Sequence, residues 1–241
     1  MRQFIGGLLL LLSLVITGCL EDPTTQDLTA DELTRQGWEY FMKAVNAYPL
    51  DGNSDYCKAV EKFDLAVYTD PEFADAYNGL GWAYLRINLF AEAYINFERG
   101  LRFASGEVRR EMTIGLASAL LQENNIQKAT FAKNMLVDVV YGLSITTIEG
   151  DELPEDWTFS RDAAITDSNV HMNLAWAYLF TSRNYATDAE KLAIIGVDTD
   201  ASNSPTAWGQ YNYAAANGEI DSGELLKLYN ALVMISGLAK R

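Results

Sequence analysis

One spacing of small and aromatic residues recurs along this chain and restricts its fold more than any other feature of the sequence. The clearest copy consists of Tyr77-x-x-Leu80-Gly81-x-x-Tyr84 followed by Ala93-x-x-x-Phe97. Intervals of three and four residues are typical of one face of an α-helix. Further fragments of the same pattern are Gly37-x-x-Tyr40, Ala59-x-x-x-Phe63 ahead of Pro71, Leu116-Ala117-x-Ala119-Leu120 and Leu174-Ala175-x-Ala177-Tyr178.

These motifs resemble the tetratricopeptide repeat, a helix–turn–helix unit of roughly 34 residues. The resemblance spans about residues 30–238, and it is specific within 33–105 and 171–180. A unit of this kind cannot bury its apolar face alone and needs stacked neighbours. The resemblance therefore implies an all-α fold: an α-solenoid of about five tetratricopeptide-like helix–turn–helix hairpins, with an irregular insertion between the third and the fourth.

The same motifs suggest how the chain is divided. We expect a lipoprotein signal peptide at 1–18, a flexible tether at 19–29 and hairpins one to three at 30–142. An acidic and aromatic insertion occupies 143–167, and hairpins four and five with a C-terminal capping helix occupy 168–241. The insertion is expected to be either a small β-hairpin or a loop packed by its aromatic residues. The C-terminal helix either closes the stack or lies along its groove.

The first residues are typical of a secreted, lipid-anchored protein. Arg2 precedes an apolar run, Phe4 to Ile16, which is too short to span a bilayer comfortably. The following Ile16-Thr17-Gly18-Cys19 resembles the bacterial lipobox, which implies that Cys19 is diacylated and becomes the mature N-terminus. Two or three fatty chains hold a protein firmly on a membrane. The alternative is an ordinary signal peptide whose cysteine is accidental.

With the repeats, this start makes the chain similar to tetratricopeptide lipoproteins of bacterial envelopes. The resemblance implies a protein that is lipid-anchored and faces the periplasm, and Leu20 after the cysteine favours the outer membrane. The formal net charge of −15 makes nucleic acid an unfavourable partner. Once Cys19 is acylated, Cys57 is the one remaining cysteine, so no intrachain disulfide is expected. We expect Cys57 to be buried as a small apolar residue.

Most motif residues are assigned to packing. Small side chains where the two helices of a hairpin cross allow close approach, and larger ones there would overpack the contact. These small residues are Gly37, Gly81, Ala117 and Ala175. Phe63 and Phe97 are expected to pack toward the next unit.

One regularity goes beyond the motif. Trp38, Trp82 and Trp176 each follow directly after a small motif residue. In the repeat family, this face of the first helix lines the concave surface, and one turn further on it carries Phe41, Leu85, Leu121 and Leu179. Large aromatic side chains with an N–H group suit contact with a peptide or a sugar. The alternative is that a short stack buries this stripe against itself or under the C-terminal helix.

Two polar residues flank the stripe. Asn78 and Arg86 could hold a carboxylate or a backbone amide of a bound segment, or they could be solvated surface residues. The candidate partner-binding residues are therefore Trp38, Trp82, Trp176, Phe41, Leu85, Leu179, Asn78 and Arg86. If the stripe binds a ligand, Trp82→Ala should abolish that binding and leave the helical circular dichroism intact.

Candidates for chemistry are few. The one histidine, His171, is expected to be a packing residue, and no nucleophile, zinc or phosphate-binding motif is present in the sequence. An enzyme that works through paired carboxylates such as Glu152 and Asp156 is ranked last among the possible functions. We therefore expect no cofactor, metal or catalytic residue. The first-ranked function is a membrane-anchored scaffold that binds a protein or peptide partner. The alternative is a lipoprotein that binds a carbohydrate or a small ligand through the tryptophan stripe.

Overall fold

The computed structural model describes residues 28–47, 52–123, 125–143, 152–217 and 220–239. The predicted signal peptide, Cys19 and most of the predicted tether lie outside these ranges, as do residues 144–151 of the insertion. Within them the chain is helical, with one isolated antiparallel bridge between Thr158 and Thr166. The all-α prediction is therefore confirmed for the described residues. None of the described helices is long and apolar enough to cross a membrane.

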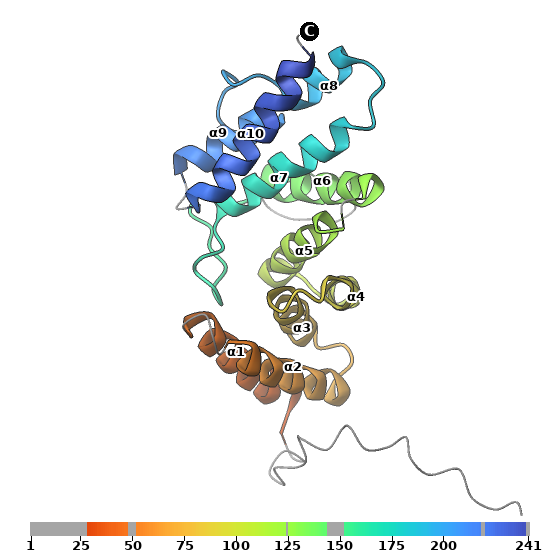
Figure 1. Ribbon diagram of the computed structural model, residues 1–241. Coiled ribbons are helices and arrows are strands. Elements are labelled where there is room, and N and C mark those ends of the chain that lie inside the picture. Colours follow the sequence, from red (N-terminus) through yellow and green to blue (C-terminus); the bar gives the residue numbers. More distant parts are fainter. Residues whose placement is uncertain (1–27, 48–51, 124, 144–151, 218–219, 240–241) are drawn as a thin grey trace, which may run out of the picture.

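Ten helices follow one another along the described parts of the chain (Figure 1). They are α1 (Ala30–Asn46), α2 (Gly52–Thr69), α3 (Ala74–Arg86), α4 (Phe90–Gly100), α5 (Gly106–Leu121), α6 (Ile126–Tyr141), α7 (Asp167–Ser182), α8 (Asp188–Ile195), α9 (Ala207–Asn217) and α10 (Ser222–Ala239).

Local capping chemistry sets several of these boundaries. At the start of α1, the Thr29 hydroxyl accepts a hydrogen bond from the Glu32 amide, and the Glu32 carboxylate accepts one from the Thr29 amide. Thr187 and Glu190 repeat this capping box at α8. Helix α6 ends at Gly142, which has a φ of 61° and so adopts a left-handed conformation that favours glycine.

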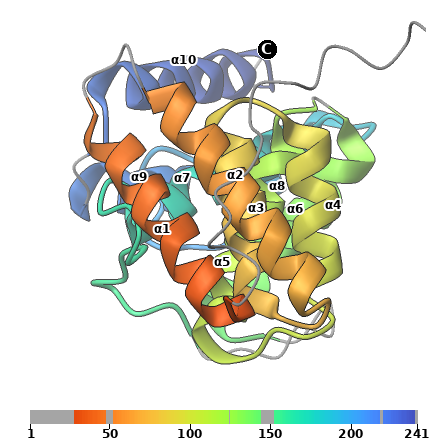
Figure 2. The same ribbon diagram turned by 90° about the horizontal axis from the view of Figure 1, so that it is seen from below.

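The helices are arranged in sequence order. From α1 to α7, each helix packs against the next one along the chain, and α1, α3, α5 and α7 also contact one another in turn. Figure 1 shows α1 and α2 at one end of the molecule and α8 to α10 at the other, and in Figure 2 the molecule is seen from the α1 and α2 end. The far end is less regular, because α8 is short and α7 packs mainly against α6 and α9.

Two phenylalanine rings lie where the helices cross. The ring of Phe63 on α2 lies against Gly37 of α1 and Gly79 of α3. The ring of Phe97 on α4 lies in the same way against Gly81 of α3 and Gly115 of α5.

A Cβ added at any of these four glycines would come within 2.3–2.6 Å of the facing ring. Glycine is therefore needed at these positions, because the phenylalanine ring lies too close to the backbone for a larger residue. Each phenylalanine also contacts the first helix of the next hairpin.

Two expectations about exposure need correction or completion. Cys57 is exposed, because it lies on the outer side of α2 next to the buried Tyr56, so its predicted burial is wrong.

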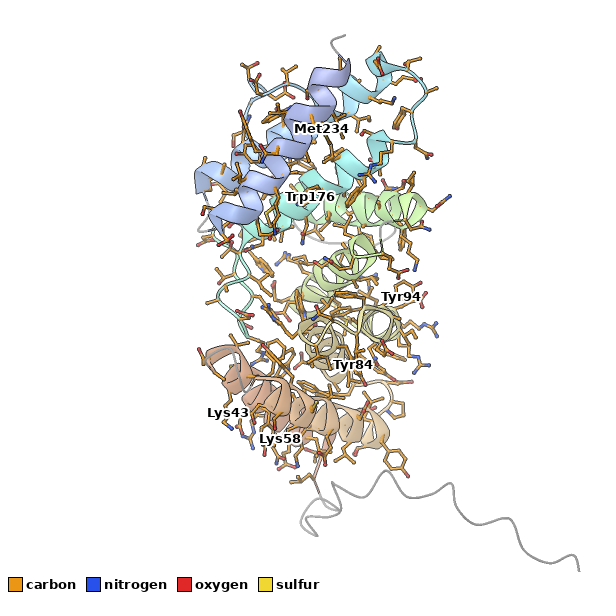
Figure 3. All side chains as sticks on the ribbon, in the orientation of Figure 1. Lys43, Lys58, Tyr84, Tyr94, Trp176 and Met234 are labelled. Carbon is orange, nitrogen blue, oxygen red and sulfur yellow. The ribbon has the colours of Figure 1, made fainter. Side chains whose placement is uncertain are left out.

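Helix α10 packs against α7, α8 and α9, and it makes no contact with α1 or α3. Its outer face leaves Leu226, Tyr229, Val233 and Met234 exposed. Met234 is labelled on this helix in Figure 3. The described part of α10 therefore does not cover Trp38 or Trp82.

Candidate functional site

Residues 157–165, between α6 and α7, form a tight turn that we name the aromatic loop. The Phe159 amide donates to the Ile165 carbonyl at 2.9 Å, and the Asp162 amide donates to the Phe159 carbonyl at 3.0 Å. The Ile165 amide donates to the Asp162 carbonyl at 2.9 Å, which closes the turn. The described part of the insertion thus shows features of both expectations: the Thr158–Thr166 bridge makes it hairpin-like, and its aromatic residues pack it. The loop extends from the start of α7 toward α1 (Figure 1).

The tip of the aromatic loop inserts Phe159 among the predicted stripe residues. The Phe159 ring stacks on the Trp82 indole with centroids 4.6 Å apart and an interplanar angle of 25°. It meets Trp38 edge-on at 6.0 Å and Phe41 edge-on at 6.4 Å. As a result, Trp38 and Trp82 are only 2% and 3% exposed. The stripe is therefore covered around these two residues, and the cover is the insertion rather than the C-terminal helix.

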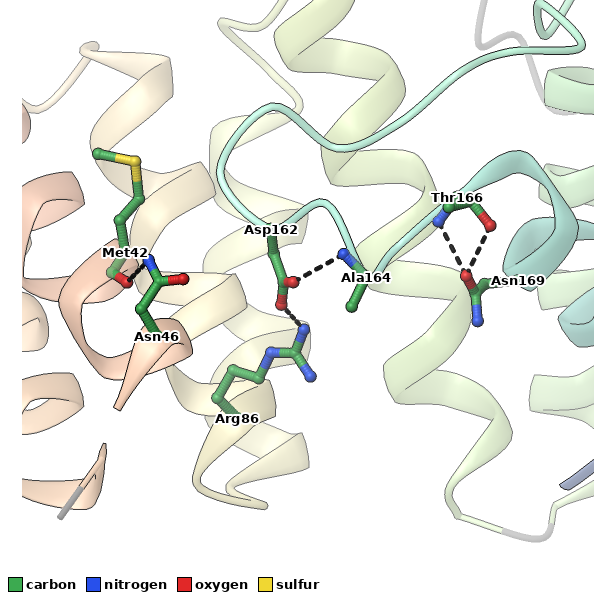
Figure 4. A network of polar contacts seen from close by, with 7 residues as sticks. All are labelled: Met42, Asn46, Arg86, Asp162, Ala164, Thr166 and Asn169. Carbon is green, nitrogen blue, oxygen red and sulfur yellow. Dashed lines mark hydrogen bonds and ion pairs between the residues drawn. The ribbon is translucent and has the colours of Figure 1, made fainter. Parts of the chain in front are cut away.

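A buried carboxylate accompanies the ring. Asp162 pairs with the Arg86 guanidinium and accepts a hydrogen bond from the Ala164 amide at 3.1 Å (Figure 4). Asp162 is buried, whereas 34% of the Arg86 side chain remains exposed. The sequence suggested that Arg86 could hold a carboxylate, and the structure supplies one from the same chain.

A second arginine of the loop lies over Trp38. The Arg161 guanidinium carbon is 4.9 Å from the centre of the Trp38 ring, a cation–π arrangement. Its Nη2 is 3.8 Å from the Asp75 carboxylate, which also accepts a 2.8 Å hydrogen bond from Trp38 Nε1. Asp75 on α3 therefore contacts both Trp38 of α1 and Arg161 of the aromatic loop.

The base of the loop is held by α5. Trp157 donates from Nε1 to the Glu107 carboxylate at 2.5 Å, and its backbone carbonyl accepts from the Asp167 amide at 2.9 Å. Glu107 also pairs with Arg110. The loop therefore makes side-chain contacts with α1, α3 and α5.

Asn78 lies in a buried polar cluster rather than at an open surface. Its Nδ2 donates to Glu111 Oε2 on α5 at 2.6 Å, while its Oδ1 is buried without a hydrogen-bond partner. Burial raises the pKa of Glu111 to about 7, and the hydrogen bond from Asn78 opposes part of this rise. Sequence reasoning missed Glu111 and Asp162, and it expected Phe159 only to pack the insertion itself. The aromatic composition of the insertion was the one available indication.

The other candidate residues lie elsewhere. Leu85 is half-buried at the end of α3, and Leu179 is buried within α7. Trp176 is half-buried on α7 and stacks on Phe180 with centroids 5.7 Å apart (Figure 3). The structure therefore brings Trp38, Phe41, Trp82 and Arg86 together around the aromatic loop, without Trp176.

A cleft of about 210 Å³ lies beside Trp82. It is lined by Trp82, Arg86, Ile114, Ser118, Ala164, Ile165, Asn169, Val170, Met172 and Asn173. Asn173 Nδ2 donates to Ser118 Oγ at 3.0 Å, and Asn169 Oδ1 accepts from the Thr166 amide at 2.8 Å. Trp82 Nε1 is buried and has no hydrogen-bond partner. The cleft thus combines neutral polar groups, an indole, the Arg86 guanidinium and apolar side chains.

His171 is a packing residue, as expected. It is buried on α7, its Nδ1 is 2.6 Å from Gln210 Oε1, and its ring stacks on Tyr213 at 3.8 Å. Burial lowers the pKa of His171. Among the described residues, no group of histidine, cysteine, aspartate or glutamate side chains is arranged to hold a metal ion.

Comparison with known proteins adds no family to this description: no protein-family model matches the chain, and no curated protein sequence matches it significantly.

Proposed function

We propose that this protein is an interaction scaffold of the bacterial envelope. In this proposal, an α-solenoid of about five tetratricopeptide-like hairpins binds a segment of a partner protein on the face that carries Trp38 and Trp82. The lipid on Cys19 tethers the scaffold to a membrane, facing the periplasm and on the outer membrane. The protein itself carries out no catalysis in this role.

One observation carries the proposal: this face already holds a non-helical segment. The aromatic loop contacts α1, α3 and α5 through an aromatic stack, a cation–π pair and a buried carboxylate. Buried aromatic and arginine contacts are the kind that dominate protein interfaces. A surface that accommodates such a segment in cis has the chemistry to accommodate one in trans.

Site-specific photocrosslinking in intact envelopes tests the proposal. A photoreactive residue at Leu85, half-buried one turn from Gly81, should capture a partner. The control position is Tyr68 near the end of α2, which is 87% exposed. Equal capture at both positions, or capture at Tyr68 alone, would contradict binding at this face.

A second candidate function is supported by the cleft beside Trp82. Amide and hydroxyl groups next to an indole, with the Arg86 guanidinium at the same cleft, suit a sugar or another small polar ligand. Such a ligand should change tryptophan fluorescence on titration with monosaccharides and short glycans. Asn173→Ala should weaken that response, because Asn173 lines the cleft. A response that is unchanged in the variant would exclude the cleft as the site.

A further inference from the structure

The aromatic loop presents two side chains to the helices in a fixed relationship. Two backbone hydrogen bonds, from Asp162 to Phe159 and from Ile165 to Asp162, hold the turn. They direct the Phe159 ring and the Asp162 carboxylate to the same surface.

Helix α3 presents the complementary pair. Trp82 and Arg86 are four residues apart on this helix, and side chains at that interval lie one above the other on a single face. The ring of Phe159 contacts Trp82, and the carboxylate of Asp162 contacts Arg86. The four-residue interval on α3 therefore fits a bound segment in which an aromatic residue is followed three positions later by a carboxylate.

The loop leaves this surface incompletely satisfied. Trp82 Nε1 is a buried donor without an acceptor, and a buried unpaired donor is unfavourable. Trp82 and Arg86 also line the cleft of about 210 Å³, whose lining mixes polar and apolar side chains and includes Ala164 and Ile165 of the docked loop. A segment that displaces the loop and places an acceptor against Trp82 Nε1 would gain a hydrogen bond that the loop does not make.

The charged contacts of the loop are partly open to water. The side chains of Arg161 and Asp75 are 36% and 25% exposed, and their closest atoms are 3.8 Å apart. Ion pairs of this kind contribute little. Docking of the tip therefore depends mainly on Phe159 and on the Arg86–Asp162 pair.

We propose that the aromatic loop is an intramolecular stand-in for the partner. The partner segment carries a large aromatic residue followed three positions later by a carboxylate, as Phe159 and Asp162 do, and it displaces the loop when it binds. The segment gains its advantage from the unpaired Trp82 Nε1, because a ligand shifts an equilibrium only through differential affinity for the two states. This inference rests on the proposed function and specifies its partner.

A peptide added in trans tests the inference. The probe is a labelled peptide with the sequence of residues 155–167, EDWTFSRDAAITD. The receptors are the full mature protein and its Phe159→Ala/Asp162→Ala variant, whose own loop no longer competes. We expect the variant to bind the peptide at least about tenfold more tightly than the wild type, since the docked loop reduces the competent fraction.

Two controls define the result. A peptide in which the phenylalanine is replaced by alanine should bind neither receptor, and a Tyr68→Ala protein should bind the probe as weakly as the wild type does. A variant that keeps its helical circular dichroism and yet fails to bind the peptide would overturn the inference.

Hydrogen exchange of the wild type gives an answer even if the double variant does not fold. The amides of Phe159, Asp162 and Ile165 all make hydrogen bonds within the loop. If the loop undocks alone, these amides should exchange at least about 100-fold faster than those in the middle of α3. Equal rates would mean that the loop opens only with global unfolding, and the inference would fail.

The two proposals fail separately. A partner captured at Leu85 whose bound segment lacks the aromatic–x–x–carboxylate spacing would leave the proposed function standing and remove this inference. Binding of the peptide without any captured partner would do the opposite.

Discussion

The ring of Phe159 stacks on the indole of Trp82, with centroids 4.6 Å apart, although three helices separate the two residues along the chain. The contact completes the face of α3 with a residue from outside the hairpins. The contact also couples the insertion to the helical stack. Substitutions in the loop should therefore change the free energy of unfolding of the whole protein.

The loop contacts should be energetically coupled. Phe159→Ala is expected to reduce the free energy of unfolding by about 3 kcal/mol, since a buried aromatic side chain is lost. Asp162→Ala alone should cost about 1 kcal/mol, because Arg86 can still reach water. The double variant should cost clearly less than the sum, because an undocked loop has no second contact left to lose. Urea denaturation of the four proteins measures this cycle, and strictly additive costs would contradict a loop that docks as a unit.

Trp82→Ala is no longer a clean test of ligand binding. The side chain is buried between Phe159 and Phe97, so truncation should cost about 3–5 kcal/mol. For a protein of this size, that corresponds to a lowering of Tm by about 6–20 °C. Thermal unfolding followed by circular dichroism checks the expectation, with Tyr68→Ala as the exposed control. A Tm within a degree of the wild type would show that Trp82 contributes little to packing.

Two glycines should respond to alanine in opposite directions. Gly81→Ala places a Cβ 2.4 Å from the Phe97 ring, so overpacking should destabilise the protein by about 1–3 kcal/mol. Gly237→Ala on α10 meets nothing within 4 Å, so the better helix propensity of alanine should stabilise it by up to about 1 kcal/mol. Denaturation midpoints of the two variants decide the matter. A stabilising Gly81→Ala would show that the helices are farther apart than described.

Glu111 should make stability depend on pH. Its folded pKa of about 7 lies above the ordinary value of 4.5, so the folded state binds this proton more tightly than the unfolded chain does. The contribution is full below about pH 4.5 and is lost as the pH rises through about 7. Glu111→Gln, which resembles the protonated acid, should come closest to the wild type below about pH 4.5. Near pH 8 it should be more stable, by about 2–3 kcal/mol.

The comparison needs two controls. Glu72→Gln, at an exposed position before α3, should show no such pH-dependent difference. The lowered pKa of His171 acts in the opposite direction, since its contribution is lost as the pH falls below about 6.5. Subtracting wild type from variant at each pH cancels that contribution. A constant difference between pH 5 and pH 8 would contradict the raised pKa of Glu111.

Lipidation can be tested on two cysteines. Metabolic labelling with a fatty-acid analogue should mark the wild type, and the label should be lost in Cys19→Ser, which should also leave the detergent phase. Cys57→Ser is the matched control, because this exposed cysteine is not part of a lipobox motif. Label that persists in Cys19→Ser would refute the predicted anchor.

Much of the helical framework could be predicted because its determinants are local in the sequence. Thr29 caps α1 through a residue three positions away, and α8 lies between Thr187 and Gly196 as its capping residues indicate. The small residues of the motif and the phenylalanines facing them follow from a periodicity within each hairpin. The contact of Phe63 with Gly79 then follows from the requirement that one hairpin pack on the next.

Only the tertiary structure decided what covers the tryptophans and which polar groups meet. Arg86 and Asp162 are 76 residues apart, and Asn78 and Glu111 are 33 apart, so no periodic pattern relates the members of either pair. Their contacts depend on the angle at which successive hairpins stack and on the path of a loop without regular structure. Those depend on packing over the whole molecule, and the same packing decides that Cys57 faces water while Trp82 does not.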